Sequence, residues 1–476
     1  MKTITVDVAI IGAGTAGLYA LREVRRARKS FVLLDSGPLG TTCARVGCMP
    51  SKVALHAGEL WSVRHEQKAF GVQGTGKLSI DRQQAWKKVR QMRDDFASRA
   101  AGNARKAAGK HLLMGRARFI EPTLLAVRTD QGETRIRAQA VVIATGSRPV
   151  VPQFLEPFAS HCLTTDDLFE LDVLPARLGI LGLGAIGLEM GLALSRLDVE
   201  VVGADMASSI GGIRDPEVAA HALASLGQQF PMHLGSPAQL EATDQGEGII
   251  LRTDTEAIPV DKVLVALGRR SNVDSLDLAG AGLELDEHGM PSFNPHTMQI
   301  GKLPVYIAGD ANSARTLMHE AAEEGAMAGF NAARLGSQAF ERKVPLAIAF
   351  TQPDIITVGA SLDALDDQSV IIGGAFTETN GRSRILSSDP GILRIYIDRN
   401  NARILGASMV GPRAEHVAQF IGLAIQQDMT AHQLMQGPYY HPVVEEMVQS
   451  ALQDALRQMP ATDTPLGLVP MAGRTG

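Results

Sequence analysis

Cysteine is nearly absent from this chain, with three residues among 476. Three thiols cannot build the framework of several disulfides that holds small secreted proteins together. A run of about 18 apolar residues, the length a membrane-spanning helix needs, is also missing. The net charge is −5, and there is no long basic block of the kind that binds nucleic acid. These absences predict a globular protein without a membrane or nucleic-acid partner.

Glycine, in contrast, is enriched, at 48 residues. Glycine suits tight turns and places where the backbone must approach a ligand closely. The apolar N-terminal stretch is interrupted by Asp7, and no small-residue cleavage region follows it. We therefore interpret it as a first strand rather than a signal peptide, and we expect a cytoplasmic protein.

The first motif is a strand, a glycine turn and a helix. The apolar run Val6–Ile11 leads into a GxGxxG pattern with Gly12, Gly14 and Gly17, and a second strand then ends at Asp35. In this context the pattern predicts a dinucleotide site, because glycines let the backbone approach a pyrophosphate at the helix N-terminus. Asp35 falls where a carboxylate would hold a ribose hydroxyl. The alternative is a tight turn without a ligand.

The same pattern recurs about 170 residues later, which predicts two nucleotide-binding units. Its glycines are Gly182, Gly184 and Gly187. Further strand-like segments end in glycine turns, where open α/β sheets bind ligands; these ends include Ala144, Thr145, Gly146, Gly268, Gly309 and Asp310. From about Val344 the pattern changes to antiparallel-like strands followed by helices, which indicates an α+β unit.

Cys43 and Cys48 lie five residues apart. In a regular helix their Cα atoms would be roughly 8–9 Å apart, whereas a disulfide needs less than about 7 Å. A bridge therefore requires a distorted helix, which Gly47 and Pro50 make possible. Two buried inert thiols remain an alternative, and so does a zinc site, although His56 is the only further ligand nearby.

The spacing of Cys43 and Cys48, followed by Pro50-Ser51-Lys52, resembles the flavin-dependent pyridine nucleotide–disulfide oxidoreductases, and most of all dihydrolipoamide dehydrogenase. The likeness runs from about Val6 to Leu456. It implies an α/β fold with two Rossmann-like dinucleotide-binding domains and a C-terminal α+β dimerisation domain. The implied layout is an FAD domain over 1–150 and 271–343, an NAD domain over 151–270, a dimerisation domain over 344–459 and a disordered tail over 460–476.

The resemblance also assigns cofactor residues. FAD would lie against one set, which comprises Gly12, Gly14, Gly17, Asp35, Ala144, Thr145, Gly146, Gly309, Asp310, Met318 and His319. Lys52 would pair with Glu189 near the flavin N5 atom. NAD would lie against Gly182, Gly184, Gly187 and the turn at Gly268. The acid that usually holds the NAD ribose would fall at Gly203, with Asp205 two positions later, and NADP therefore stays possible.

The implied chemistry is the oxidation of a dithiol with reduction of NAD. Cys43 would face the substrate and Cys48 the flavin, while His441, oriented by Glu446, acts as the base. The resemblance further implies a homodimer in which the His–Glu pair serves the other subunit, a small dithiol or lipoyl-domain substrate, and no metal.

Two features leave the substrate open. Val443 replaces a usual threonine, and Tyr439 and Tyr440 stand where dihydrolipoamide dehydrogenases often have another histidine. The alternatives are an NAD(P)H-dependent disulfide or mercuric-type reductase, and a flavin-binding interaction protein without turnover. Cys162 lies outside these motifs, and we interpret it as a structural thiol.

Overall fold

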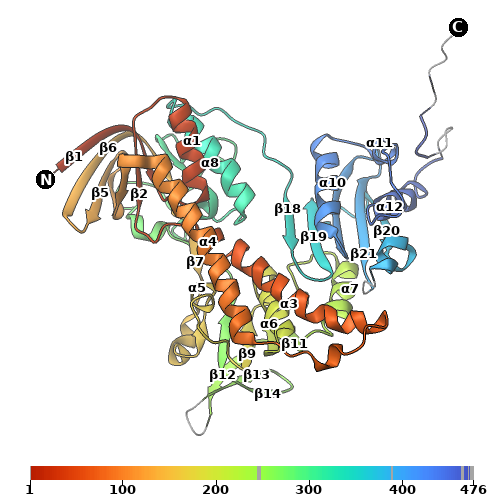
Figure 1. Ribbon diagram of the computed structural model, residues 1–476. Helices are drawn as coiled ribbons and strands as arrows, with labels where there is room; N and C mark the ends of the chain where they lie inside the picture. The colour runs from red at the N-terminus through yellow and green to blue at the C-terminus, as the bar shows by residue number, and fades with distance from the viewer. Residues whose placement is uncertain (1, 244–247, 387–389, 462–465, 470, 472–476) are drawn as a thin grey trace.

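The computed structural model describes residues 2–243, 248–386, 390–461, 466–469 and 471. Its elements form three groups, each around one of the three largest sheets (Figure 1). The predicted α/β class is confirmed, and the predicted disorder of residues 460–476 falls largely outside the described residues. No described helix is long and apolar enough to cross a membrane.

The first sheet has β1 (Lys2–Ile11) at its centre, parallel to β2 (Phe31–Asp35) and to β6 (Gly132–Ile143). The order is β3-β2-β1-β6-β5-β4, and β17 pairs with the end of β6. The remaining strands are β3 (Leu112–Met114), β4 (Arg116–Glu121), β5 (Leu124–Thr129) and β17 (Val305–Ile307). The chain thus returns to this sheet after building the second one.

Helices α1 (Thr15–Arg26) and α8 (Met318–Ala332) pack against each other beside the first sheet (Figure 1). Their backbones come very close, because a Cβ added at Gly325 would lie 2.2 Å from the Ala16 carbonyl oxygen, and one at Gly329 would lie 2.4 Å from that of Ala20. This contact fixes the start of α8 beside the first glycine turn.

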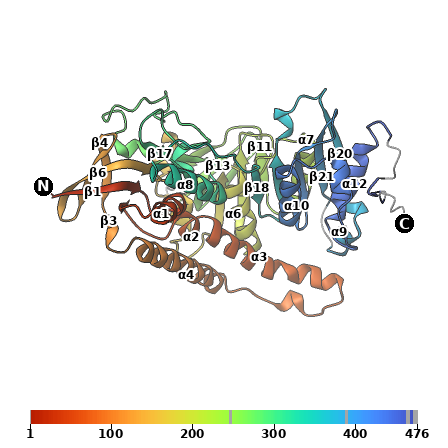
Figure 2. The same cartoon turned by 90° about the horizontal axis from the view of Figure 1, so that it is seen from above.

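A helical arm is inserted between β2 and β3. It consists of α2 (Thr42–Arg45), α3 (Cys48–Ala69) and α4 (Arg82–Ala108), and Figure 2 shows α3 and α4 extending below the sheets. Helix α3 also packs against α6 (Ala185–Arg196) of the second group. The arm therefore connects the two nucleotide-binding units.

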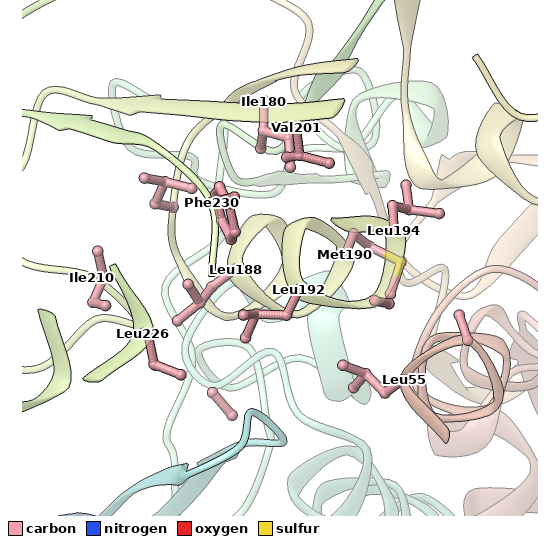
Figure 3. Close-up of a cluster of buried hydrophobic side chains, with 14 of the residues drawn as sticks. Leu55, Ile180, Leu188, Met190, Leu192, Leu194, Val201, Ile210, Leu226 and Phe230 are labelled. Atoms are coloured by element: carbon pink, nitrogen blue, oxygen red, sulfur yellow. The ribbon is translucent and has the colours of Figure 1, made fainter. Parts of the chain in front are cut away.

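The second sheet is parallel, in the order β11-β10-β9-β15-β8. Its strands are β8 (Cys162–Leu163), β9 (Arg177–Leu181), β10 (Glu200–Asp205), β11 (Met232–Leu234) and β15 (Lys262–Val265). Helix α6 lies between this sheet and α3, and Figure 3 shows the buried side chains that join them, among them Leu55, Ile180, Leu188, Met190, Leu192, Leu194, Val201 and Phe230.

Small elements surround the second sheet. They are α5 (Thr165–Leu168), α7 (Pro216–Leu226), the sheet of β12 (Gln239–Ala242), β13 (Ile249–Arg252) and β14 (Ala257–Val260), and the pair of β7 (Ser147–Pro149) and β16 (Arg269–Ser271). Because β7 follows the first sheet and β16 follows the second, this pair ties the two units where the chain passes between them.

The third sheet is antiparallel, in the order β18-β19-β22-β21-β20. Its strands are β18 (Leu346–Ala349), β19 (Asp354–Gly359), β20 (Val370–Phe376), β21 (Ile392–Asp398) and β22 (Ile404–Gly411). The helices of this group are α9 (Gly381–Ile385), α10 (Ala414–Gln426), α11 (Ala431–Met435) and α12 (Glu446–Leu456). Apolar side chains of α10 and α12 close one core with the sheet, which matches the predicted α+β unit.

Candidate active site

The first glycine turn is built so that two of its glycines admit no side chain. Gly12 has φ +111°, and a Cβ there would lie 2.1 Å from the Ala144 carbonyl oxygen, while a Cβ at Gly17 would lie 1.8 Å from that of Gly12. Gly14 is different, because nothing lies within 4 Å of its Cβ position at the start of α1. The turn therefore packs tightly on one side and leaves open space in front of the helix N-terminus.

The second turn repeats this arrangement. A Cβ at Gly182 (φ +93°) would lie 2.5 Å from the Ala266 carbonyl oxygen, and one at Gly187 would lie 1.9 Å from that of Gly182. Gly184 again faces open space, at the start of α6. Each unit thus offers backbone N–H groups and a helix N-terminus to an anionic group, as a dinucleotide pyrophosphate requires.

The acid of the second unit is Asp205, and the expectation at Gly203 is wrong. Gly203 lies inside β10, where a Cβ would meet a Leu183 methyl carbon at 2.7 Å. Strand β10 continues through Gly203 to Asp205, which closes it. Its carboxylate accepts N–H groups from Leu183 at 2.6 Å and Ala207 at 2.8 Å.

Asp35 has the same contacts in the first unit. Its carboxylate accepts N–H groups from Ala13 at 2.7 Å and Gly37 at 2.6 Å. The sequence carried a signal for this equivalence, because Gly12 to Asp35 and Gly182 to Asp205 span the same number of residues. Both acids therefore stand at the end of the second strand of their unit, beside its glycine turn.

One cavity brings about half of the predicted site residues together. It runs from the start of α1 past the two cysteines to the start of α6 and is lined, among others, by Gly14, Thr15, Ala16, Cys43, Cys48, Lys52, Ala144, Gly146, Ala185, Ile186, Glu189, Gly309, Asp310 and Met318. Ile348 of β18 also reaches it. All three groups of elements thus contribute to its wall.

The cysteines lie on either side of a helix break. Helix α2 ends at Arg45 and α3 begins at Cys48, so the distortion that a bridge requires is present. A Cβ on Gly47 would lie 3.2 Å from the Thr42 carbonyl oxygen and 3.4 Å from the Cys43 Cα, which explains glycine at the break. Pro50 lies in the first turn of α3, where a missing N–H leaves no helical bond unmade.

The two thiols are free and differ in acidity. The Cys43 thiol donates a hydrogen bond to the Cys48 sulfur, and this bond, helped by the charge of Lys52 against the effect of burial, lowers the pKa of Cys48 to about 6. The same bond and burial raise the pKa of Cys43. Cys48 is therefore the sulfur that ionises first.

Lys52 is held in place beside Cys48. Its ammonium donates to both Glu189 carboxylate oxygens, at 2.9 and 2.7 Å, and lies 4.7 Å from the centre of the Phe350 ring. The Phe350 N–H in turn donates to Glu189 at 2.9 Å. The predicted pair of Lys52 and Glu189 is thus present, on helices α3 and α6.

The other predicted cofactor residues differ in whether they lie at the cavity. Asp310 accepts a hydrogen bond from Ser147 at 2.6 Å, and the Thr145 hydroxyl is buried with no partner in the described chain. Gly268, with φ +99°, follows β15 and is not among the residues that line the cavity, although the next residue, Arg269, is. His319 is in the first turn of α8, but its half-exposed side chain lines a separate surface hollow between α1 and α8 and does not line the cavity.

The predicted base and its partner form a pair in the third group. His441 Nδ1 lies 2.9 Å from Glu446 Oε1, and Glu446 also accepts the Val443 N–H at 3.1 Å. The His441 side chain is 78% exposed and is not among the residues that line the cavity. Within one subunit, His441 therefore lies outside the cavity that contains Cys43 and Cys48.

The two tyrosines have different surroundings. Tyr439 packs edge-on against Phe420 and donates to the Leu434 carbonyl at 3.2 Å, so it belongs to the core. Tyr440 is 79% exposed, beside His441. Cys162 lies half-buried in β8, an edge strand of the second sheet, outside the cavity. In the described part of the chain, no three His, Cys, Asp or Glu residues are arranged to hold a metal ion.

Residues 6–325 match the pyridine nucleotide-disulphide oxidoreductase family, and residues 345–452 match its dimerisation domain. The chain belongs to this family. It is 30% identical to the dihydrolipoyl dehydrogenase of Thermus scotoductus over 468 residues, which cover 95% of this chain and 98% of that protein. It is 26% identical to dihydrolipoyl dehydrogenase 3 of Haloarcula marismortui over 474 residues, with 95% and 97% covered.

Solved structures share the fold of this family member. LpdA from Mycobacterium tuberculosis superposes with a TM-score of 0.82 at 21% identity, covering 97% of this chain and 100% of that one. The Cu(II) complex of the HOCl-induced flavoprotein disulfide reductase RclA from Escherichia coli also gives 0.82, at 20% identity, with 94% and 99% covered. The chain is thus an FAD-dependent dithiol/disulfide oxidoreductase with a dimerisation domain.

The residues present fit the two cofactors of the family. Each glycine turn leaves open space at the start of its helix, each unit ends its second strand in an aspartate, and the buried Thr145 hydroxyl has an unused hydrogen-bonding capacity beside the first turn. Flavin and a nicotinamide nucleotide can therefore be held at opposite ends of the cavity that contains the cysteines.

Proposed function

We propose that the protein oxidises a small dithiol or a lipoyl-bound dithiol and reduces NAD, through Cys43 and Cys48. The observation that carries this proposal is the single cavity that both sulfurs share with the starts of α1 and α6. A thiol couple placed between two dinucleotide turns is suited to passing electrons from one side to the other.

In the proposed reaction the enzyme starts with Cys43 and Cys48 joined as a disulfide. A substrate thiolate attacks the Cys43 sulfur, and the Cys48 sulfur leaves as the thiolate. The second substrate thiol then displaces Cys43, so that the substrate becomes a disulfide and the enzyme a dithiol that holds two more electrons. Cys48 is a good leaving group because its pKa is low.

The remaining groups handle protons and charge. His441 of the partner subunit takes the substrate proton, and the Glu446 contact leaves its Nε2 atom available as the base. Lys52, fixed by Glu189, stabilises the Cys48 thiolate. FAD, when bound, supplies a two-electron carrier between this dithiol and the nicotinamide.

We infer NAD as the nicotinamide nucleotide because of Asp205. An acid at the end of the second strand can bind the 2′-hydroxyl of the NAD ribose and repels the 2′-phosphate of NADP. Met206, Ala207 and Ser208, which follow it, bring no cation to offset that repulsion.

The test is the substitution Cys48→Ser in the purified dimer. We expect bound FAD to be kept and reduction of NAD by dihydrolipoamide to fall to background, because the disulfide can no longer form. Cys162→Ser, at a thiol outside the cavity, is the matched control and should keep both properties. Retained turnover in Cys48→Ser would contradict the proposal.

A second candidate is the reverse reaction, reduction of a disulfide other than lipoamide by NADH or NADPH. It is favoured by the exposed Tyr440 beside His441 and by the core position of Tyr439, which leave no second imidazole there. Comparing kcat/KM for dihydrolipoamide with NAD against oxidised glutathione with NADH or NADPH separates the two directions.

A further inference from the structure

Two carboxylates of α8 are buried although the proposed reaction does not use them. Glu320 is 1% exposed and Glu324 is fully buried. Burying a carboxylate is costly unless hydrogen bonds and an opposite charge compensate it. The groups that compensate these two glutamates lie on elements that reach the cofactor cavity.

Glu324 holds the turn that carries Asp310. Its Oε2 atom accepts the Gly309 N–H at 2.8 Å and the Asn312 side-chain amide at 2.7 Å. The turn Gly309–Asn312 is thus fastened at both ends to one carboxylate oxygen. Gly309 and Asp310 line the cavity directly, so the position of Glu324 sets the position of that wall.

Arg342 joins the two glutamates to each other. Its Nη2 atom lies 2.6 Å from Glu320 Oε2 and 2.7 Å from Glu324 Oε1. Like charges four residues apart on one helix repel, and the guanidinium between them removes this repulsion. Burial raises the pKa of Glu324, whereas the charge of Arg342 opposes that rise.

Arg342 lies on the segment that leads from α8 to β18, the first strand of the dimerisation domain. A second cation, Arg315, lies 3.1 Å from the other oxygen of Glu320. The start of α8, with Met318 on the cavity wall, is therefore fastened through Glu320 on one side and through Glu324 on the other.

We propose that Glu320, Glu324 and Arg342 are positioning residues, the α8 carboxylate cluster, through which the segment entering the dimerisation domain fixes the Asp310 turn and the start of α8 against the flavin. This inference rests on FAD as the bound flavin. The cluster touches neither substrate nor reacting sulfur, and it acts through Gly309 and Asp310.

Glu324→Gln tests the cluster with little change of shape. The glutamate accepts hydrogen bonds at both oxygens, whereas a glutamine side chain has only one oxygen and must turn its NH₂ group toward another donor. Either Arg342 or the pair of Gly309 and Asn312 then loses its acceptor. Leaving such buried donors unpaired should speed FAD release by about tenfold or more.

Arg342 gives the second set of variants. Arg342→Met removes the charge and should speed FAD release to a similar extent. Arg342→Lys keeps a charge near both carboxylates, so its FAD release should stay closer to the wild-type rate. The matched controls are Glu341→Gln and Lys343→Met, two exposed positions on the same segment, and both should behave as wild type. The Arg342 side chain is 11% exposed and that of Glu324 is 0% exposed, so the Arg342 variants serve if Glu324→Gln does not fold.

The measurements are FAD release from the purified holoenzyme, followed by flavin fluorescence, and the visible circular dichroism of the bound flavin. We expect faster FAD release and an altered circular dichroism spectrum of the flavin in Glu324→Gln and Arg342→Met. It is overturned if both stay as in wild type while only the unfolding temperature falls. A wild-type protein without FAD would overturn the proposed function as well.

Discussion

Cys43 and Cys48 show how neighbours give one residue type two behaviours. The Cys43 thiol donates a hydrogen bond to Cys48, and this bond raises the pKa of Cys43 and lowers that of Cys48. The charge of Lys52 lowers the pKa of both thiols, but it ranks higher among the causes at Cys48 than at Cys43. The more acidic sulfur is thus the one at the start of α3, where a helix N-terminus also favours negative charge. The division of roles between the sulfurs follows from this asymmetry.

We predict that the reduced protein has one reactive thiol in mildly acidic solution. Because the pKa of Cys48 is lowered to about 6, its thiolate is present above that pH and is lost below it. Alkylation of Cys48 by iodoacetamide, followed by peptide mass spectrometry, should therefore rise with a midpoint near pH 6, while Cys43 and Cys162, whose pKa values are raised, react slowly.

Lys52→Met should move that midpoint upward, since the mutation removes the cation that favours the thiolate. Lys68→Met, at the exposed end of the same helix, is the control and should leave it unchanged. A Cys48 midpoint near the ordinary thiol value of 9 in the wild-type protein would contradict the assignment.

Asp205 supports a second prediction at this scale. Asp205→Asn should lower kcat/KM for NAD by about tenfold or more, because a charged acceptor for the ribose is lost. NADP should suffer less, so that the preference for NAD narrows. Steady-state kinetics with both nucleotides measure the ratio, and Glu200→Gln, at the other end of β10, is the control. An unchanged ratio would show that Asp205 does not select the nucleotide.

At the level of single residues, motif spacing predicted both sets of glycines and the helix distortion between the cysteines, whereas the contact of Lys52 with Glu189 was implied by the resemblance to the family. The position of the acid was predicted at Gly203 because it was counted from an assumed strand end. Strand β10 extends beyond its apolar residues, and the acid at its end is Asp205. Glu324 and Arg342 carry no motif, and only the packing of the segment after α8 back against that helix shows that their side chains meet.

The glycine turns connect residues to elements. In each turn the first glycine leaves room for the carbonyl of the residue that follows a neighbouring strand, and the third leaves room for the carbonyl of the first glycine. The middle glycine faces open space. The same motif thus contains two kinds of position, one needed for folding and one needed for the ligand.

Substitutions in the first turn should separate these two roles. Gly12→Ala should lower the free energy of unfolding by at least about 2 kcal/mol, because it combines a positive φ with a clash against the Ala144 carbonyl. Gly14→Ala should leave apo-protein stability within about 0.5 kcal/mol and weaken FAD binding. Denaturant unfolding and flavin fluorescence measure the two effects, and equal destabilisation by both substitutions would count against the distinction.

Element boundaries could be predicted only in part. The break between α2 and α3 follows from the geometry that a bridge needs, and Gly47 marks it. The helical arm of α3 and α4 was not recognised, since most of α3 beyond its first turns has no apolar stripe of its own and gains its place by packing on α6. The last helix begins at Glu446, because His441–Glu445 forms the turn that presents the histidine.

At the scale of the whole molecule, the residues that we propose as catalytic lie in two separate places. The cavity holds the cysteines, Lys52 and Glu189, while His441 and Glu446 lie exposed on the dimerisation domain. Composition could not reveal this separation, and the resemblance to the family implied it. The domain limits at 150, 270 and 343 remain predictions, although the return of β17 to the first sheet and the pairing of β7 with β16 are consistent with a chain that leaves the first unit and comes back.

The central claim is that the cysteines of one subunit work with His441 of the other, and a dimer of two different variants tests it most directly. Cys48→Ser and His441→Gln should each abolish dithiol-dependent NAD reduction in the homodimer. A heterodimer of the two variants, purified through different tags, has one site with both defects and one site with neither. It should therefore recover about half of the wild-type activity. A heterodimer as inactive as its parents would contradict the claim that the cysteines of one subunit work with the histidine of the other.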